Sequence, residues 1–279
     1  MHNYQLRKRI VVWVVFCMVL ILTVVWLTPI LVALLTSLRS YDDIMLRGFF
    51  AVPEELSFDS YLRAWRQGRM RQYLPNSFMI TLPALGATLL LSSLSAYAIS
   101  RFRFPGRRPI YYMFIFGMML PLQILMIPVF GLSNSVGLYD TYIGLIAIHT
   151  AFFLGFNTFV LKNYMSTVPP QIFDSAHIDG CSELRIWWQI MLPLTLPAFA
   201  ALATLLFTWI FNDYLWALIL IRTGAKMPVT TGLASLQGEF VTDWTVIMAG
   251  SLIATVPTLT VFIFLQRYFI EGLTMGSNK

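Results

Sequence analysis

The chain has 279 residues, of which 58% are apolar and only 11% are charged, whereas about a quarter of the residues of a soluble domain are charged. So few charges cannot cover a water-facing surface, and the composition predicts a helical protein that crosses a membrane several times. The net charge of +6 does not indicate nucleic-acid binding, because the basic residues flank apolar runs, where membrane topology and anionic lipid account for them.

Six apolar segments are long enough to cross a hydrocarbon core of roughly 30 Å as helices. They span residues 10–36, 77–99, 109–133, 142–161, 193–220 and 245–266. The predicted fold class is therefore all-α, a polytopic bundle of six transmembrane spans. The first segment follows a basic start and is about twice as long as the apolar core of a signal peptide, so we expect a retained anchor.

The distribution of Lys and Arg predicts the orientation of the spans. Basic residues precede the first span, and four arginines fill the short loop RFRFPGRR after the second, whereas the loop NSVGLYDT after the third has none. Both termini and residues 162–192 are therefore expected in the cytoplasm. Residues 39–75 are placed outside; they carry six arginines beside five acids, a weak hint of an anionic ligand or lipid.

Prolines occur in most of the spans, at Pro29, Pro83, Pro121, Pro128, Pro197 and Pro257. Each removes a backbone donor and tends to kink a helix. Membrane helices commonly tolerate proline, so these residues need have no functional role. The functional alternative is that the kinked helices leave a cavity or a moving gate.

The sequence lacks three common motifs of nucleotide-binding proteins, metalloproteases and serine hydrolases. It has no G-x-x-x-x-G-K-[ST], H-E-x-x-H or G-x-S-x-G pattern, so the chain is not expected to hydrolyse ATP or to be an enzyme. Cys17 and Cys181 fit neither a disulfide framework nor a metal site. His149 stands alone in the fourth span, where a packed side chain is expected more often than a ligand. No cofactor or metal is predicted in this chain.

The fourth and fifth spans are separated by a polar stretch whose local signals predict a helix, a tight turn and a second helix. Pro170 suits a first helical turn, Gly180 a left-handed end, and Ser182 an N-cap. Ile172, Phe173 and Ala176 form one apolar face, and Ile186, Trp187 and Ile190 form another. The stretch suits either a helix lying on lipid or a docking site for a soluble partner. Its excess of acid favours docking, because acid is unfavourable at an anionic membrane surface.

This stretch contains Asp174-Ser175-Ala176, then Asp179-Gly180-Cys181, and it ends with Leu192-Pro193. The pattern resembles the EAA loop of ABC-importer permeases, in which Glu-Ala-Ala and Asp-Gly-Ala stand at the first two places and an apolar residue with Pro closes the pattern. The first acid is shorter than in the family and a serine replaces an alanine, but the spacing is kept. Three further stretches resemble carbohydrate-importer permeases of the maltose-transporter type. They are WIFNDYLWALIL, MPVTTGLASLQGEFVTDW and the C-terminal QRYFIEGLT.

The resemblance implies a sugar importer of the bacterial or archaeal cytoplasmic membrane. In it, residues 162–192 would be the coupling loop that docks on an ATPase dimer, where MgATP binds. The coupling positions would be Asp174, Ser175, Ala176, Asp179, Gly180 and Pro193. A second related permease, forming a heterodimer, and an extracytoplasmic solute-binding protein would complete the transporter. Arg222–Trp244 resembles the loop that reaches the binding protein.

The resemblance also implies a domain organisation. An N-terminal anchor and external segment would occupy residues 1–71, the permease core residues 72–267, and a cytoplasmic tail residues 268–279.

Span five carries a polar and aromatic cluster, formed by Trp209, Asn212, Asp213, Tyr214 and Trp216. An acid inside a span needs a partner or a wet cavity. A hydrogen bond between helices, an interfacial aromatic belt and a sugar pathway all fit the cluster.

The alternative function is a stand-alone secondary carrier for a small polar solute, which usually shows two similar halves; no convincing repeat is visible. A membrane enzyme would need more convergent acids and histidines than His149 and Asp213 supply. A disaccharide, an oligosaccharide and glycerol phosphate remain open as substrates.

Overall fold

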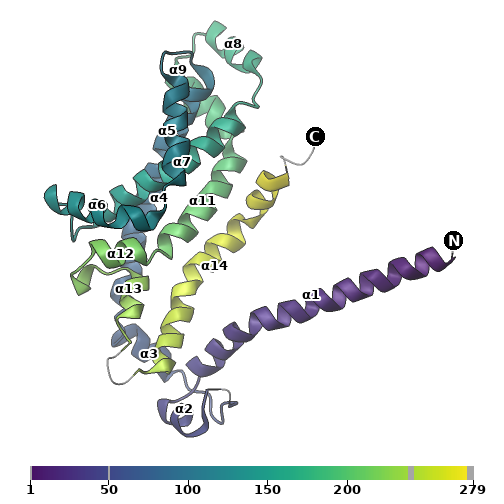
Figure 1. The fold of residues 1–279 in the computed structure, drawn as a ribbon, viewed down its shortest axis with the longest axis vertical. Coiled ribbons are helices and arrows are strands. Elements are labelled where there is room, and N and C mark those ends of the chain that lie inside the picture. The colour runs from purple at the N-terminus through teal and green to yellow at the C-terminus, as the bar shows by residue number, and fades with distance from the viewer. Residues whose placement is uncertain (1, 50, 238–241, 275–279) are drawn as a thin grey trace. The chain divides into compact units, whose positions relative to one another are not determined.

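A computed structural model describes residues 2–49, 51–237 and 242–274. Within these ranges the chain forms helices joined by loops and contains no strand (Figure 1). The predicted all-α class is confirmed. The C-terminal motif QRYFIEGLT continues the last helix, and residues 275–279 lie outside the described residues, as do residues 238–241.

Four of the described helices are long and apolar enough to cross a membrane, and up to six spans result if two sharply bent helix pairs each count as one. The four are α1 (His2–Ser37), α4 (Met70–Arg101), α7 (Tyr142–Met165) and α14 (Trp244–Thr274). They cover the first, second, fourth and sixth predicted spans. The third predicted span corresponds to the first bent pair, and the fifth, 193–220, overlaps the second, which runs from Glu183 to Phe211.

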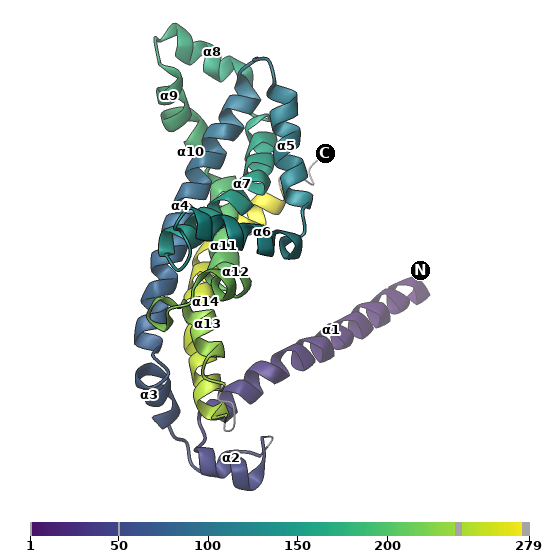
Figure 2. The same cartoon turned by 60° about the vertical axis from the view of Figure 1, so that its left-hand side comes forward.

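The third span is not one helix. It breaks into α5 (Arg107–Met119) and α6 (Leu122–Ser135), which are bent by 103°. Leu120 and Pro121 between them have extended backbone angles, as expected for a proline and the residue before it. Figures 1 and 2 show α5 beside α7, with α6 turned across them. At 13 and 14 residues, each half is about 20 Å long at 1.5 Å per residue.

The prolines do not act alike. Pro29, Pro83, Pro128 and Pro257 lie inside continuous helices, and Pro197 lies in the first turn of a helix. The two sharp bends lie at Pro121 and just before Pro197, whereas the other four prolines interrupt no helix, so a proline by itself does not show where a span is interrupted.

The fifth span is interrupted on both sides of its main helix, α11 (Leu196–Phe211). Before it lie α9 (Glu183–Ile186), a π turn (Trp187–Met191) and α10 (Leu192–Leu194), and this leading section meets α11 at 77°. After it, the helix stops at Asn212 and resumes as α12 (Leu215–Leu220).

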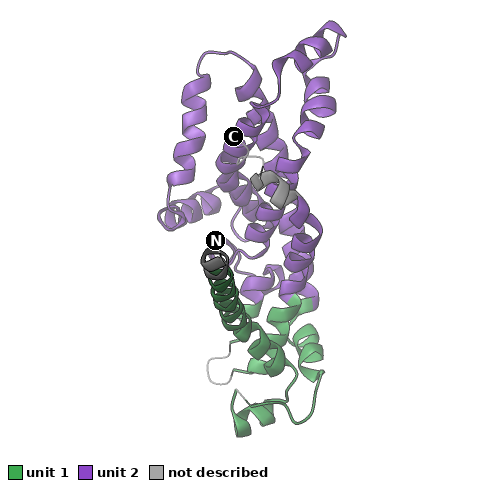
Figure 3. Cartoon of the chain, turned by 90° about the vertical axis from the view of Figure 1, so that its right-hand side faces the viewer, with its two compact units in different colours: residues 1–70, 233–253 green, residues 71–232, 254–279 purple. Residues whose placement is uncertain are grey.

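The chain divides into two compact units (Figure 3). Unit 1 comprises residues 1–70 and 233–253 and contains α2 (Tyr41–Arg47) and α3 (Asp59–Arg66). Three of the six arginines in residues 39–75 are paired with acids of this unit. Arg39 is fully buried and donates to Asp43, and Arg63 pairs with Asp59 and Asp243. These ion pairs occupy Arg39, Arg47 and Arg63, so at those three positions they remove support from the hint of an anionic ligand.

Unit 2 comprises residues 71–232 and 254–279, and its core lies among α4, α7 and α11. One apolar cluster joins these helices to α8 (Pro170–Ile178) and the π turn, and a second joins them to α12. A 3-10 turn (Gly224–Lys226) and α13 (Val229–Ala234) follow α12. At Gly155, the backbone of α7 approaches α5 so closely that a Cβ would lie 2.6 Å from the Phe114 carbonyl oxygen.

Candidate functional site

The loop between α7 and α11 has the predicted form of a helix, a turn and a second helix. Pro169 is extended, and Pro170 opens α8 at its first position, where its missing N–H is not needed. The helix ends in a Schellman motif. The Cys181 N–H donates to the Ala176 carbonyl and the Gly180 N–H donates to the His177 carbonyl, both at 3.0 Å. Gly180 has a φ of 76°, the left-handed conformation that this motif requires.

The predicted coupling residues divide by exposure. Asp174, Ser175 and Asp179 are exposed, whereas Ala176 is buried. Ala176 belongs to the apolar cluster that includes Phe173 of the same helix. The structure therefore makes Ala176 part of the anchor of α8 and leaves the acids accessible to a partner.

Exposed apolar side chains on this loop were not predicted as functional. Ile178 is 87% exposed, Leu184 is 70% exposed and Trp188 is 63% exposed. None of the three belongs to the two apolar faces predicted from the sequence. An apolar residue outside such a face was the sequence signal that could have indicated a contact surface. Of those faces, Phe173, Ala176, Ile186 and Trp187 are buried, while Ile172 is 38% exposed.

Pro193 accompanies the irregular passage from the loop into α11. It has no N–H to donate to the Gln189 carbonyl, and the turn before it is of the π type, in which the Leu192 N–H donates to the Trp187 carbonyl. Thr195, fully buried, donates its hydroxyl to the carbonyls of Met191 and Leu192. The chain direction at this end of the loop is thus set by Pro193 and Thr195 together.

The span-five cluster does not converge on one site. Trp209 is 42% exposed and Tyr214 is 40% exposed. Asn212 is also exposed and bonds to the Thr208 carbonyl of its own helix. Trp216 is 2% exposed. The side chains therefore point in different directions, three outward and one into the core.

Asp213 has a structural position at the break between α11 and α12. Its carboxylate accepts hydrogen bonds from the backbone N–H groups of Trp216 and Ala217, in the first turn of α12. His149 of α7 is 2% exposed, its Nε2 lies 3.7 Å from Asp213 Oδ2, and neither ring nitrogen has a hydrogen-bond partner among the described residues. His149 is thus a packed residue, and Asp213 caps a helix.

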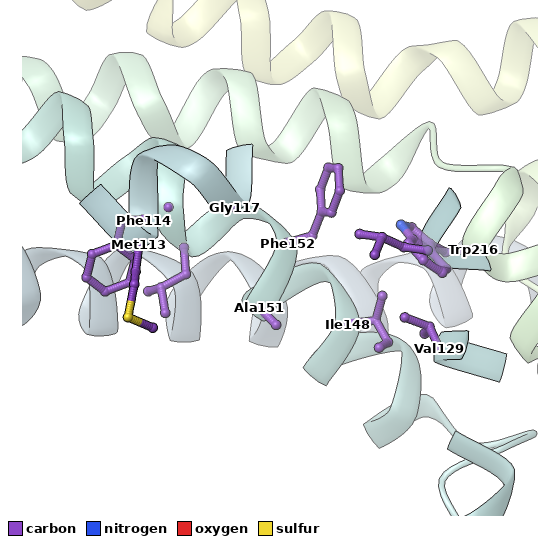
Figure 4. A pocket seen from close by; sticks show the side chains of 11 residues that line it. Met113, Phe114, Gly117, Val129, Ile148, Ala151, Phe152 and Trp216 are labelled. Atoms are coloured by element: carbon purple, nitrogen blue, oxygen red, sulfur yellow. The ribbon is translucent and has the colours of Figure 1, made fainter. Parts of the chain in front are cut away.

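A cavity of about 240 Å³ lies between α5, α6, α7 and α12. Figure 4 shows Ile148, Phe152 and Trp216 around the same hollow. Its lining is mainly apolar, whereas a polyhydroxylated ligand needs hydrogen-bond partners. The lining therefore argues against direct sugar contact by Trp216.

The start of the predicted binding-protein segment is held by Asp140. Its carboxylate accepts hydrogen bonds from the Arg222 and Thr223 backbones at 3.0 and 2.9 Å, from the Thr223 hydroxyl at 2.6 Å and from Lys226 Nζ at 3.1 Å. Burial raises the pKa of Asp140, but these hydrogen bonds outweigh it and hold the pKa below its ordinary value. Residues 238–241 of the same segment lie outside the described residues.

No group of three or more His, Cys, Asp or Glu side chains able to hold a metal occurs in the described part of the chain.

Similarity to known proteins shows the family of the chain. Residues 88–274 match the family described as binding-protein-dependent transport system inner membrane component.

Two curated relatives match along almost the whole chain. The osmoprotective compounds uptake permease protein GgtD of Synechocystis sp. is 33% identical over 94% of this chain and 90% of its own length. The arabinooligosaccharides transport system permease protein AraQ of Bacillus subtilis is 32% identical, with 93% of both chains covered.

Among solved structures, a bacterial ABC transporter involved in the import of the acidic polysaccharide alginate contains a chain with the same fold. The TM-score is 0.84 at 25% identity, over 94% of this chain and 97% of that chain. Neither a stand-alone carrier nor a membrane enzyme fits these matches. The chain belongs to the inner membrane components of binding-protein-dependent transport systems, and it is a non-catalytic, multi-pass permease subunit of an ABC importer.

Proposed function

We propose that this permease imports an oligosaccharide, together with a second related permease and an ATPase dimer that docks on residues 162–192. The substrate class rests on relatives: AraQ is named for arabinooligosaccharides, and the structural neighbour imports alginate. ATP is used by the partner ATPase in this family. Both termini and the loop 162–192 lie in the cytoplasm in this proposal, as the loop arginines indicate.

One observation carries the docking proposal: the loop is anchored on one side and open on the other. Phe173 and Ala176 hold α8 in the core. On the other side, exposed acids lie close in sequence to exposed Ile178 and Leu184. A surface that combines a central apolar contact with charged neighbours is typical of protein–protein interfaces. Lipid would favour Lys and Arg on the polar side.

The coupling residues have different roles in this proposal. Asp174, Ser175 and Asp179 contact the ATPase directly. Ala176 anchors the helix, Gly180 sets the turn, and Pro193 directs the chain into α11. Movement of the ATPase then reaches the membrane helices through the loop.

The candidates for substrate contact are Trp209, Asn212 and Tyr214, because they are exposed. Aromatic faces beside an amide suit the C–H faces and hydroxyls of a sugar. The segment Arg222–Trp244 is proposed to meet the solute-binding protein, and residues 72–267 to form the permease core.

Site-directed crosslinking tests the docking. Cys17 and Cys181 are replaced by alanine, a single cysteine is placed at Asp174, and the crosslinked partner is identified by mass in membranes that contain the complete transporter. We expect an adduct with the ATPase whose yield changes with ATP.

A cysteine at Val136 is the matched control. It is 57% exposed but lies in the loop between α6 and α7, on the opposite side of the membrane in the proposed topology, so it should give no ATPase adduct. Crosslinking of Asp174→Cys to lipid alone would refute the docking proposal.

A further inference from the structure

Glu183, the first residue of α9, connects two other helices through its two carboxylate oxygens. The Tyr97 hydroxyl of α4 donates to Oε2 at 2.6 Å. The His177 Nε2–H of α8 donates to Oε1 at 2.8 Å. The coupling loop is thus tied to α4, which is distant from it in the sequence.

The two ends of this connection differ in burial. Tyr97 is 5% exposed and packs in the same cluster as Phe173 and Ala176. The side chains of His177 and Glu183 are 47% and 43% exposed. One end is therefore held in the helical core, and the other belongs to the accessible part of the loop.

Arg101, one helical turn after Tyr97 on α4, makes a second connection. Its guanidinium lies 3.7 Å above the centre of the Phe173 ring. It also donates to the carbonyls of Met165 and Val168, both at 2.9 Å, which precede α8. Residues four apart share one face of a helix, so one face of α4 holds both the entry of the loop and the start of its second helix.

Chain connectivity alone would transmit loop movement poorly. At its exit, the loop reaches α11 through a π turn and a 77° bend, so a displacement of α8 is easily absorbed there as rotation. A direct contact with α4 bypasses this bend, because α4 is one continuous helix of 32 residues.

We propose that Tyr97 and Glu183 are positioning residues that couple ATPase-driven movement of the loop to α4. This inference rests on the proposed docking of residues 162–192. Glu183 holds the second helix of the loop in line with the first, through His177, while Tyr97 fixes that assembly to the core. The unit that moves is then the loop together with the end of α4.

The test uses the complete transporter reconstituted in proteoliposomes with its binding protein. Tyr97→Phe removes only the hydroxyl, and Glu183→Ala removes the carboxylate. The readout is the number of substrate molecules imported per ATP hydrolysed. We expect this ratio to fall about tenfold in each variant, the effect of losing a charge-assisted hydrogen bond. The double variant should be no worse than Glu183→Ala, because both changes remove one shared contact.

Two further variants complete the design. Tyr112→Phe removes the same group from a residue that is 54% exposed, and it should leave the ratio unchanged. The Asp174→Cys crosslink is measured in every background. If the Asp174→Cys protein with Tyr97 and Glu183 intact gives no ATPase adduct, the proposed function fails. If Tyr97→Phe keeps the adduct and a normal ratio, or if import and ATP hydrolysis fall in parallel, the positioning role is refuted.

Discussion

Substitution of Gly180 isolates the effect of backbone conformation at the turn of the coupling loop. The residue has a φ of 76°, and a Cβ added to it would contact nothing within 4 Å. A Cβ therefore meets no steric conflict among the described residues, and its cost comes from the left-handed conformation. For an L-residue that cost is roughly 1–2 kcal/mol, which corresponds to about a 5- to 30-fold change in the population of the turn.

The predicted order of activity follows from side-chain type. Asparagine adopts the left-handed conformation more readily than other non-glycine residues, while a β-branched residue adopts it least. Gly180→Asn should therefore retain most import, Gly180→Ala should lose part of it, and Gly180→Val should abolish coupling while the protein still reaches the membrane. The measurements are import and ATP hydrolysis in proteoliposomes, with the amount of permease determined by quantitative immunoblot.

The asparagine variant decides between two causes. If Gly180→Asn is as defective as Gly180→Val, then a side chain at this position collides with the docked partner, and the backbone explanation is wrong. Normal import by Gly180→Val would contradict both the backbone argument and the role of the turn in coupling.

Three further predictions concern the rest of unit 2. Gly155→Ala places a Cβ 2.6 Å from the Phe114 carbonyl oxygen, whereas a Cβ at Gly117 meets nothing within 4 Å; the first variant should therefore lower the melting temperature in detergent and Gly117→Ala should not. Asp213→Ala should lose a helix cap and about 0.5–2 kcal/mol of stability, whereas Asp213→Asn keeps a hydrogen-bond acceptor and should melt near the wild-type temperature. If the asparagine variant binds substrate more weakly at unchanged stability, Asp213 contacts the substrate instead. Because hydrogen bonds lower the pKa of Asp140 in the folded protein, its stabilisation should be full above pH about 4, the unfolded value, and should disappear as the pH falls further. Asp140→Asn should reduce this loss in a melting-temperature series from pH 7 to pH 3, and an unchanged acid dependence would contradict the assignment.

The sequence determined the features that depend on neighbouring residues. The apolar run lengths predicted the spans, since the bilayer thickness sets the length of helix required. Pro170 and Gly180 predicted the start of α8 and its left-handed end, because backbone preference at these positions is local. The spacing around Asp174 and Gly180, together with the similar stretches in span five, before span six and at the C-terminus, placed the chain among ABC-importer permeases, and the family match agrees.

The tertiary structure decided what depends on distant residues. Pro83 lies in a continuous helix while Pro121 stands at a 103° break, although both lose the same hydrogen-bond donor. Likewise, the sequence around Glu183 gives no indication of the partner of its side chain. Its bond to Tyr97 joins residues 86 positions apart, and only the packing of α4 against the loop brings them together. Local chemistry sets how each segment bends, but the partner of a side chain is set by which helices pack side by side.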